Sequence, residues 1–140
     1  MKVIATLISL IAAVAAQNTA IGYPPDQTTV SPGQNMTVQI NRPNSLTGSQ
    51  EVAVVIAVGH CFATPCDNTE RLGAILYNGP FNPQYPTNHT PQDTPQQNFT
   101  VQIPPGMATG PAALTLVHLS LVGAGPLPFM ETHNVTLNVQ

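Results

Sequence analysis

The stretch NMTVQI, residues 35–40, decides the fold class, because the chain repeats its pattern as NFTVQI (residues 98–103) and as NVTLNV (residues 134–139). In a β-strand, successive side chains point to opposite faces. Each copy therefore places three apolar side chains on one face, and an asparagine, a threonine and a second amide on the other. This alternation predicts three half-buried strands with apolar inner faces and polar outer faces.

Each copy also begins with Asn-x-Thr, the acceptor sequence for an N-linked glycan. The asparagine lies on the predicted outer face, where a bulky sugar fits. A fourth acceptor sequence lies in a proline-rich loop. We therefore predict N-glycosylation at four asparagines, Asn35, Asn88, Asn98 and Asn134.

Residues 1–16 have the layout of a secretory signal peptide, with Lys2 followed by the apolar run VIATLISLIAAVAA, which ends in small residues. This run is shorter than the roughly 20 residues that a membrane-spanning helix needs. We therefore expect cleavage before Gln17 and no membrane insertion. The prediction is a secreted, extracellular protein with a signal peptide at 1–16 and a single domain at 17–140.

The chain is poor in charge: only 6% of its residues are charged, against about 25% in typical globular domains. Without Lys2, two arginines face six carboxylates, which gives a net charge of −4. Such a chain cannot neutralise phosphates, so nucleic acid and anionic membrane surfaces are poor partners. Glycans on the outer strand faces would explain how so few charges keep the protein in solution.

Further strands are predicted at residues 51–60, 71–78 and 112–122, and a short edge strand within residues 20–30 is interrupted by two prolines. A long loop rich in proline and asparagine covers residues 78–96. About seven strands separated by turn signals, without a convincing helix, predict an all-β protein with an immunoglobulin-like antiparallel β-sandwich. A small Greek-key barrel is the alternative.

The stretches TVSPGQNMTVQI, LGAILYNGPFNP and NFTVQIPPGMATGPAALTLVHLSLVGAG, together with the closing NVTLNV, resemble the fungal necrosis-inducing secreted protein family. The resemblance covers most of the predicted domain. It implies a small secreted sandwich protein that acts as an effector on plant immune signalling and can provoke cell death. It implies no catalytic residue.

The segment HCFATPCDNTER holds both cysteines, Cys61 and Cys66. In an oxidising compartment we expect a disulfide between them, which would pin a short loop and contribute roughly 2 kcal/mol. A redox or metal pair is the less favoured alternative, because no second cysteine pair accompanies it. His60, Asp67 and Glu70 lie in the same segment and could form an acid–base group, but solvated loop side chains are the favoured interpretation.

Three aromatic residues, Tyr77, Phe81 and Tyr85, surround the start of the proline-rich loop. They could form a binding patch, but rings in such a position more often pin the loop to the core. The chain contains neither G-x-S-x-G nor H-E-x-x-H, two of the motifs that mark common hydrolases.

The last two long strands predict a hairpin across GAGPLPF. A turn centred between Gly125 and Pro126 would place His118 opposite His133 on the core side, where two imidazoles could bind a metal or sense acid pH. A slip of one residue would instead place His118 opposite Asn134 on the outer face. Two ligands make a poor metal site, so we predict no metal, no cofactor and two structural histidines.

The sequence therefore predicts a secreted, N-glycosylated, effector-like interaction protein that is not an enzyme. It would act by binding a protein, such as a host receptor or signalling protein. The alternative is a structural or cell-wall-associated secreted fungal glycoprotein without effector activity, and a small hydrolase or metal protein is a third interpretation. Nothing in the sequence indicates the oligomeric state.

Overall fold

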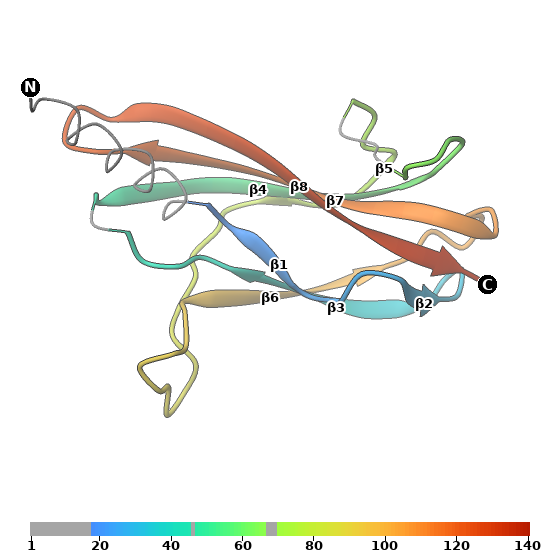
Figure 1. Ribbon diagram of the computed structural model, residues 1–140, viewed down its shortest axis with the longest axis horizontal. Helices are drawn as coiled ribbons and strands as arrows, with labels where there is room; N and C mark the ends of the chain where they lie inside the picture. Colours follow the sequence, from blue (N-terminus) through green and yellow to red (C-terminus); the bar gives the residue numbers. More distant parts are fainter. Residues whose placement is uncertain (1–17, 46, 67–69) are drawn as a thin grey trace, which may run out of the picture.

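The computed structural model describes residues 18–45, 47–66 and 70–140, which form two β-sheets that lie one above the other (Figure 1). The smaller sheet has the strand order β1-β3-β6, and the larger sheet has the order β2-β8-β7-β4-β5. The strands are β1 (Ala20–Tyr23), β2 (Thr28–Val30), β3 (Asn35–Asn41), β4 (Ser49–His60), β5 (Ala74–Gly79), β6 (Gln96–Gln102), β7 (Gly110–Val122) and β8 (Leu127–Val139).

The described residues form strands, turns and loops and no helix, which confirms the all-β class. Accordingly, nothing in the described ranges has the long apolar helix that crossing a membrane requires. Immunoglobulin-like topology stays a prediction, and the signal peptide predicted at 1–16 lies outside the described residues.

The three repeated stretches form β3, β6 and the end of β8. Strands β3 and β6 are neighbours, with Val38 opposite Phe99. Eight of the nine predicted inner side chains are 8% exposed or less, namely Met36, Val38, Ile40, Phe99, Val101, Ile103, Leu137 and Val139; Val135 is partly buried. The predicted outer asparagines at the head of β3 and within β6 are exposed. The alternation predicted from the sequence is thus confirmed.

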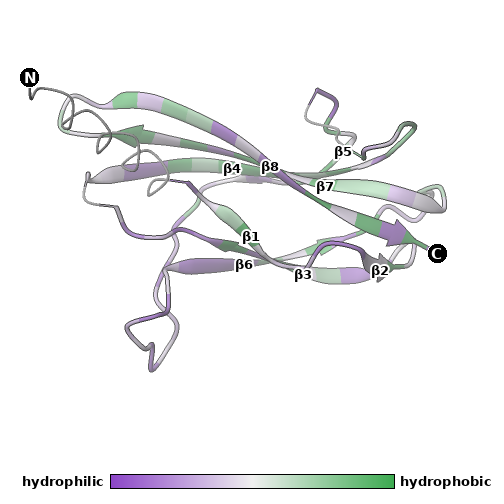
Figure 2. Ribbon diagram, viewed as in Figure 1, coloured by the Kyte–Doolittle hydropathy of each residue, from purple (hydrophilic) through white to green (hydrophobic). Residues whose placement is uncertain are grey.

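One apolar core fills the space between the sheets. The small sheet contributes Val38 and Ile40, and the large sheet contributes Ile56, Leu114 and Leu116, all at most 1% exposed. Hydrophobic residues accordingly occupy long stretches of the large sheet in Figure 2. Because both sheets share this core, the two layers form a sandwich.

The predicted edge strand at residues 20–30 becomes two strands in different sheets. Strand β1 pairs with β3 in the small sheet, whereas β2 pairs with the end of β8 in the large sheet. The chain crosses between the sheets at Pro24 and Pro25, which cannot donate a ladder hydrogen bond. The β2–β8 pair is parallel, whereas the other strand pairs within the described residues are antiparallel, as the sequence predicted.

The predicted hairpin of β7 and β8 is confirmed, but its register is neither of the two alternatives. The turn is tighter, because it occupies only residues 123–126 and starts at Gly123 with φ of +82°. His118 therefore lies opposite Glu131, and His133 lies opposite Leu116. Strand β8 accommodates Pro128 because β2 pairs only with its far end, which leaves this end of β8 as an edge. The register differs by two residues from the first alternative, so His118 still faces the core.

Strand β5 begins at Ala74, later than the predicted strand at 71–78. Gly73 has φ of +75°, and a Cβ there would lie 2.4 Å from the carbonyl oxygen of Val58 in β4. Only glycine adopts this conformation without strain at such a close approach. The backbone contact therefore fixes where the edge strand begins.

Candidate functional site

A group of charged side chains lies inside the sandwich, at the end where β4, β7 and β8 meet the small sheet. We call this group the buried charged cluster, and its members are Arg42, Glu51, His118, Glu131 and His133. The four members other than Arg42 occupy core-facing positions of their strands. The cluster concentrates ionisable groups in a chain that has few of them.

His118 is the centre of this cluster and is completely buried. Its Nδ1 lies 2.8 Å from Oε1 of Glu131, and its Nε2 lies 2.5 Å from Oε2 of Glu51. An ionised carboxylate only accepts hydrogen bonds. Both ring nitrogens must therefore donate, which makes His118 a doubly protonated imidazolium.

Glu51 reaches the core because β4 contains a bulge directly after it. The pairing of β4 with β7 shifts between Glu51 and Ala53, so that Glu51 pairs with Ser120 on the core side. Arg42, just beyond β3 and 5% exposed, donates from Nε to Oε1 of Glu51 at 2.9 Å. Its Nη2 donates to Ser49 at 2.7 Å, and Ser49 in turn donates to Glu51.

Glu131 connects the buried imidazolium to the molecular surface. Its Oε1 accepts from His118 and from both the backbone N and the hydroxyl of Thr19, at 2.7 and 2.9 Å. Its Oε2 accepts from Nε2 of His133 at 2.9 Å. The His133 side chain is 32% exposed. The cluster therefore ties β8, β7 and the residue that precedes β1.

The pKa values follow from these contacts. Burial disfavours the imidazolium of His118, but hydrogen bonds to Glu131 and Glu51 outweigh it and raise the pKa of His118 above its ordinary 6.5. Burial opposes ionisation of Glu51 too, but hydrogen bonds from His118 and Ser49 and the charge of Arg42 hold its pKa below 4.5. For Glu131, hydrogen bonds from His118 and Thr19 overcome burial and lower the pKa to about 2.

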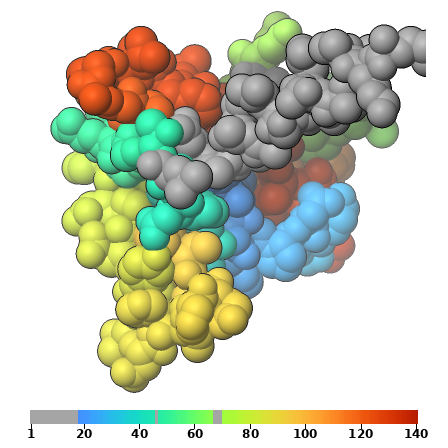
Figure 3. All heavy atoms as spheres, turned by 60° about the vertical axis from the view of Figure 1, so that its left-hand side comes forward, coloured from blue at the N-terminus to red at the C-terminus, as the bar shows by residue number. Residues whose placement is uncertain are grey.

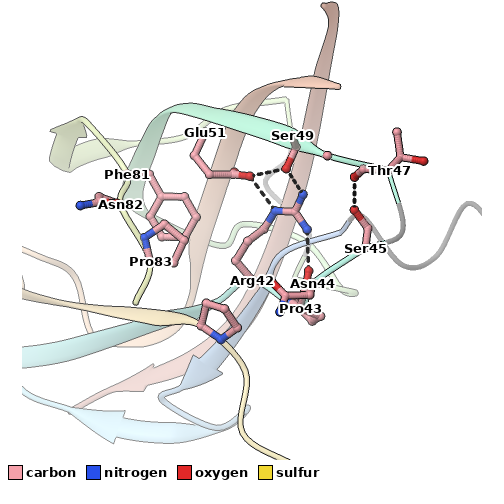
Figure 4. Close-up of a pocket in the computed structure, with 12 residues that line it drawn as sticks. Arg42, Pro43, Asn44, Ser45, Thr47, Ser49, Glu51, Phe81, Asn82 and Pro83 are labelled. Atoms are coloured by element: carbon pink, nitrogen blue, oxygen red, sulfur yellow. Dashed lines mark hydrogen bonds and ion pairs between the residues drawn. The ribbon is translucent and has the colours of Figure 1, made fainter. Parts of the chain in front are cut away.

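A pocket of about 470 Å³ adjoins the cluster (Figure 4). Arg42 and Glu51 line it from one side, together with the segment that leads into β4. Phe81, Asn82 and Pro83 line it from the loop that follows β5. In Figure 3 the teal segment before β4 and the yellow-green loop lie side by side on this face.

Phe81 joins the pocket to the cluster. Its ring is 3% exposed and meets the ring of His118 edge-on, with centroids 5.6 Å apart. The pocket therefore shares Arg42, Glu51 and Phe81 with the shell around His118. Because His118 is buried and both its nitrogens are engaged, it cannot exchange a proton directly with a ligand in this pocket.

The exterior of the large sheet has the opposite character. At outer positions of β4, β7 and β8 lies an apolar patch, formed by Val52 (39% exposed), Leu119 (36%) and Met130 (71%). Leu119 pairs directly with Met130, and with Ala53 beside the bulge at Val52. No outer position of these three strands carries a charged side chain.

The predicted disulfide partners come together. Cys61 and Cys66 lie at disulfide distance, with Cα atoms 5.4 Å apart. The acid–base group predicted from His60, Asp67 and Glu70 is not tested, because Asp67 lies outside the described residues. The ring of His60 meets the ring of Phe62 edge-on, with centroids 5.0 Å apart.

Three of the four predicted glycan acceptors, Asn35, Asn88 and Asn98, are exposed, whereas Asn134 is only half-exposed on the outer face of β8. The attached glycans themselves stay a prediction. The absence of a bound metal also stays a prediction. Within the described ranges, no group of three or more His, Cys, Asp or Glu residues has the arrangement of a metal site.

The aromatic residues pin the proline-rich loop, as the favoured interpretation predicted. Tyr77 packs on Phe99 with ring centroids 4.6 Å apart, and its hydroxyl donates to the carbonyl of Pro80. Phe81 is buried, and only Tyr85 is largely accessible, at 42%. Beyond these anchors the loop stands out from the body of the molecule (Figures 1 and 3).

The partners of His118 were not predicted from the sequence, where Arg42, Glu51 and Glu131 appear only as three of its few charged residues. A signal was present for Glu131: counting back by twos from Leu137 along the inner face of β8 reaches His133 and then Glu131. No comparable signal marks Glu51, because its facing depends on the bulge.

Comparison with known proteins adds one finding. The family model of the Nis1 family matches residues 14–138, which is nearly the whole chain. No curated protein matches the chain in sequence.

Proposed function

Because the chain belongs to the Nis1 family, a fungal family, we propose that it is a secreted, N-glycosylated interaction protein of the effector type. It acts by binding a protein partner, and the partner is a component of plant immune or cell-death signalling. This proposal joins the family membership to the sequence resemblance and to the chemistry of the molecular surface.

The observation that carries the binding proposal is the apolar patch of Val52, Leu119 and Met130. Met130 is 71% exposed and has no charged neighbour on its face of the sheet. Exposed apolar side chains that gather on a rigid, uncharged sheet are the usual centre of a protein–protein contact. Methionine also adapts its shape to a partner, because its side chain is unbranched and flexible.

The interior supports binding over catalysis. The pKa of Glu131 is lowered to about 2 and that of His118 is raised, but the side chains of these two residues are only 8% and 0% exposed. A general acid or base must come within hydrogen-bond distance of its substrate. Both nitrogens of His118 are already bound to carboxylates, so the group that would be the natural catalyst serves the fold instead.

Quantitative capture tests this proposal. Glycosylated protein from a fungal host would be immobilised and exposed to plant extract, and the bound proteins would be compared between wild type and the variant Met130→Asp. We expect one wild-type partner to fall about tenfold or more in Met130→Asp, because a charge at the centre of an apolar contact must be desolvated. Purified partner would then be used to repeat the comparison.

Ile75→Asp is the matched control, since Ile75 is an exposed aliphatic residue (58%) on the edge strand β5, outside the apolar patch. It should retain the partner. The patch is refuted as the binding surface if both variants lose the partner equally or neither does. The effector role fails if natively glycosylated protein applied to leaf tissue leaves immune signalling and cell survival unchanged.

A second candidate is a wall-associated fungal glycoprotein, and one observation favours it. The outer faces of β3 and β6 carry only amides and hydroxyls at their paired positions, with Thr37 opposite Thr100 and Gln39 opposite Asn98. Such a face forms hydrogen bonds with polysaccharide hydroxyl groups without introducing charge. Partition separates the two candidates: a wall protein stays with the insoluble wall fraction, whereas the proposed effector is recovered from the culture filtrate.

A further inference from the structure

The groups around His118 form a closed set of charges. Glu51 approaches from β4, Glu131 from β8, and Arg42 from the end of β3. His133 touches the far oxygen of Glu131, and Thr19 caps the near one from the residue before β1. The uncharged ring of Phe81 also lies against His118.

The charges of its four innermost members, Arg42, Glu51, His118 and Glu131, cancel only when His118 is protonated. Arg42 and the imidazolium carry two positive charges, and Glu51 and Glu131 carry two negative charges. Loss of the proton would leave one uncompensated negative charge in the interior. It would also turn a ring-nitrogen lone pair toward a carboxylate oxygen that now lies 2.5 or 2.8 Å away. A buried unpaired charge and two opposed acceptors are both strongly unfavourable.

We propose that His118 is a proton-operated latch, which holds this end of the sandwich closed while it is protonated and releases it when the medium becomes alkaline. The latch is independent of the proposed partner binding, since it rests only on the cluster. The pKa of His118 agrees with this geometry: burial lowers it, but the hydrogen bonds to the two carboxylates outweigh burial and raise it above 6.5.

Opening of the latch changes two parts of the molecule, the segment before β1 and the wall of the pocket. Glu131 leaves Thr19, whose backbone N and hydroxyl both depend on it, so the chain before β1 loses its attachment to β8. Glu51 leaves His118 and keeps its hydrogen bonds from Arg42 and Ser49 at that wall of the pocket. Alkaline pH thus alters the pocket from behind, through His118, which does not line it.

Nuclear magnetic resonance on the isotope-labelled, full mature protein tests the latch in two readouts. Imidazole nitrogen shifts report the protonation of His118 between about pH 5 and pH 9. Amide exchange, corrected for its intrinsic pH dependence, reports the opening at Thr19. We expect both nitrogens of His118 to be protonated at pH 6, and the protection of Thr19 to fall about tenfold or more as His118 titrates.

The amide of Phe99, in the pairing with β3, serves as the internal reference and should keep its protection. The variant His133→Gln removes the other imidazole on Glu131 and should leave the transition in place. The latch is overturned if His118 is neutral at pH 6, if Thr19 keeps its protection after His118 titrates, or if His133→Gln abolishes the transition. His118→Gln should show no alkaline transition; if this variant does not fold, the wild-type titration and His133→Gln decide the question by themselves.

Discussion

Replacing Glu131 with glutamine is the sharpest test of how much the buried charged cluster contributes to stability. The substitution keeps the size of the side chain but removes the negative charge that His118, His133 and Thr19 share. The imidazolium of His118 then retains only Glu51 as a counter-ion. The neighbouring apolar core is left as it is.

The magnitude follows from the pKa. Glu131 titrates at about 2 in the folded chain, against 4.5 for the free group. At roughly 1.4 kcal/mol for each pKa unit, this difference amounts to a free energy on the order of 3 kcal/mol. For a domain of this length, such a loss lowers the melting temperature by about 10 °C.

The directions of the two pKa shifts, of Glu131 and of His118, determine how the stability of the fold depends on pH. A depressed carboxyl pKa stabilises the fold above pH 4.5, and this contribution is lost as the pH falls toward 2. The raised pKa of His118 acts in the other direction, since its contribution is complete below pH 6.5 and is lost as the pH rises through the folded value. We therefore expect the wild-type protein to be most stable between these two limits.

Urea unfolding followed by circular dichroism measures the effect at pH 6 and at pH 2. We expect Glu131→Gln to lose on the order of 3 kcal/mol at pH 6 and little at pH 2, where wild-type Glu131 is about half protonated in the folded chain and almost fully protonated in the unfolded chain. Glu70→Gln is the control, because Glu70 is an exposed turn residue. A loss below about 1 kcal/mol at pH 6, or an equal loss at both pH values, would refute the reasoning.

Three further outcomes are expected. Gly73→Ala should lose about 2 kcal/mol or more, because a Cβ would meet the Val58 carbonyl at 2.4 Å with φ of +75°; Gly48→Ala, with nothing within 4 Å, should stay within about 0.5 kcal/mol of wild type in the same unfolding assay. Replacing Cys61 and Cys66 together by serine should lose roughly 2 kcal/mol and keep the fold, and free thiols found by alkylation of the native protein would contradict the bridge. The native protein should lose mass on glycosidase treatment, and a mature mass equal to that of the bare chain would contradict glycosylation of the strand faces.

Alternation along single strands could be predicted from the sequence, and the reason is local. In β3 and β6 every second residue is apolar, so the inner face follows from counting. The strand register could not be predicted where both faces are apolar. In β7, Leu114 and Leu116 face the core, but Val117 and Leu119 on the outer face are equally hydrophobic, so the pattern did not select one pairing.

The candidate site depended on two features that the sequence does not express. The bulge at Val52 turns Glu51 inward, and no glycine marks it. The shorter turn at Gly123 moves β8 by two residues, so that His118 meets Glu131 instead of His133. The bulge arises from the pairing of β4 with β7, which lie far apart in the chain, and the register of β7 with β8 depends on the length of the turn between them. A single strand's pattern carries no information about either.

The position of β8 has a consequence for synthesis of the protein. Strand β8 lies between β7 and β2 and is synthesised after the other seven described strands, so it completes both the large sheet and the counter-ions of His118. Until then β7 is an open edge that carries the apolar sequence LTLVHLSLV. An uncharged apolar edge is a template for pairing with other chains. A nascent chain that stalls before Leu127 is therefore expected to aggregate through β7 and not to persist as a smaller folded unit.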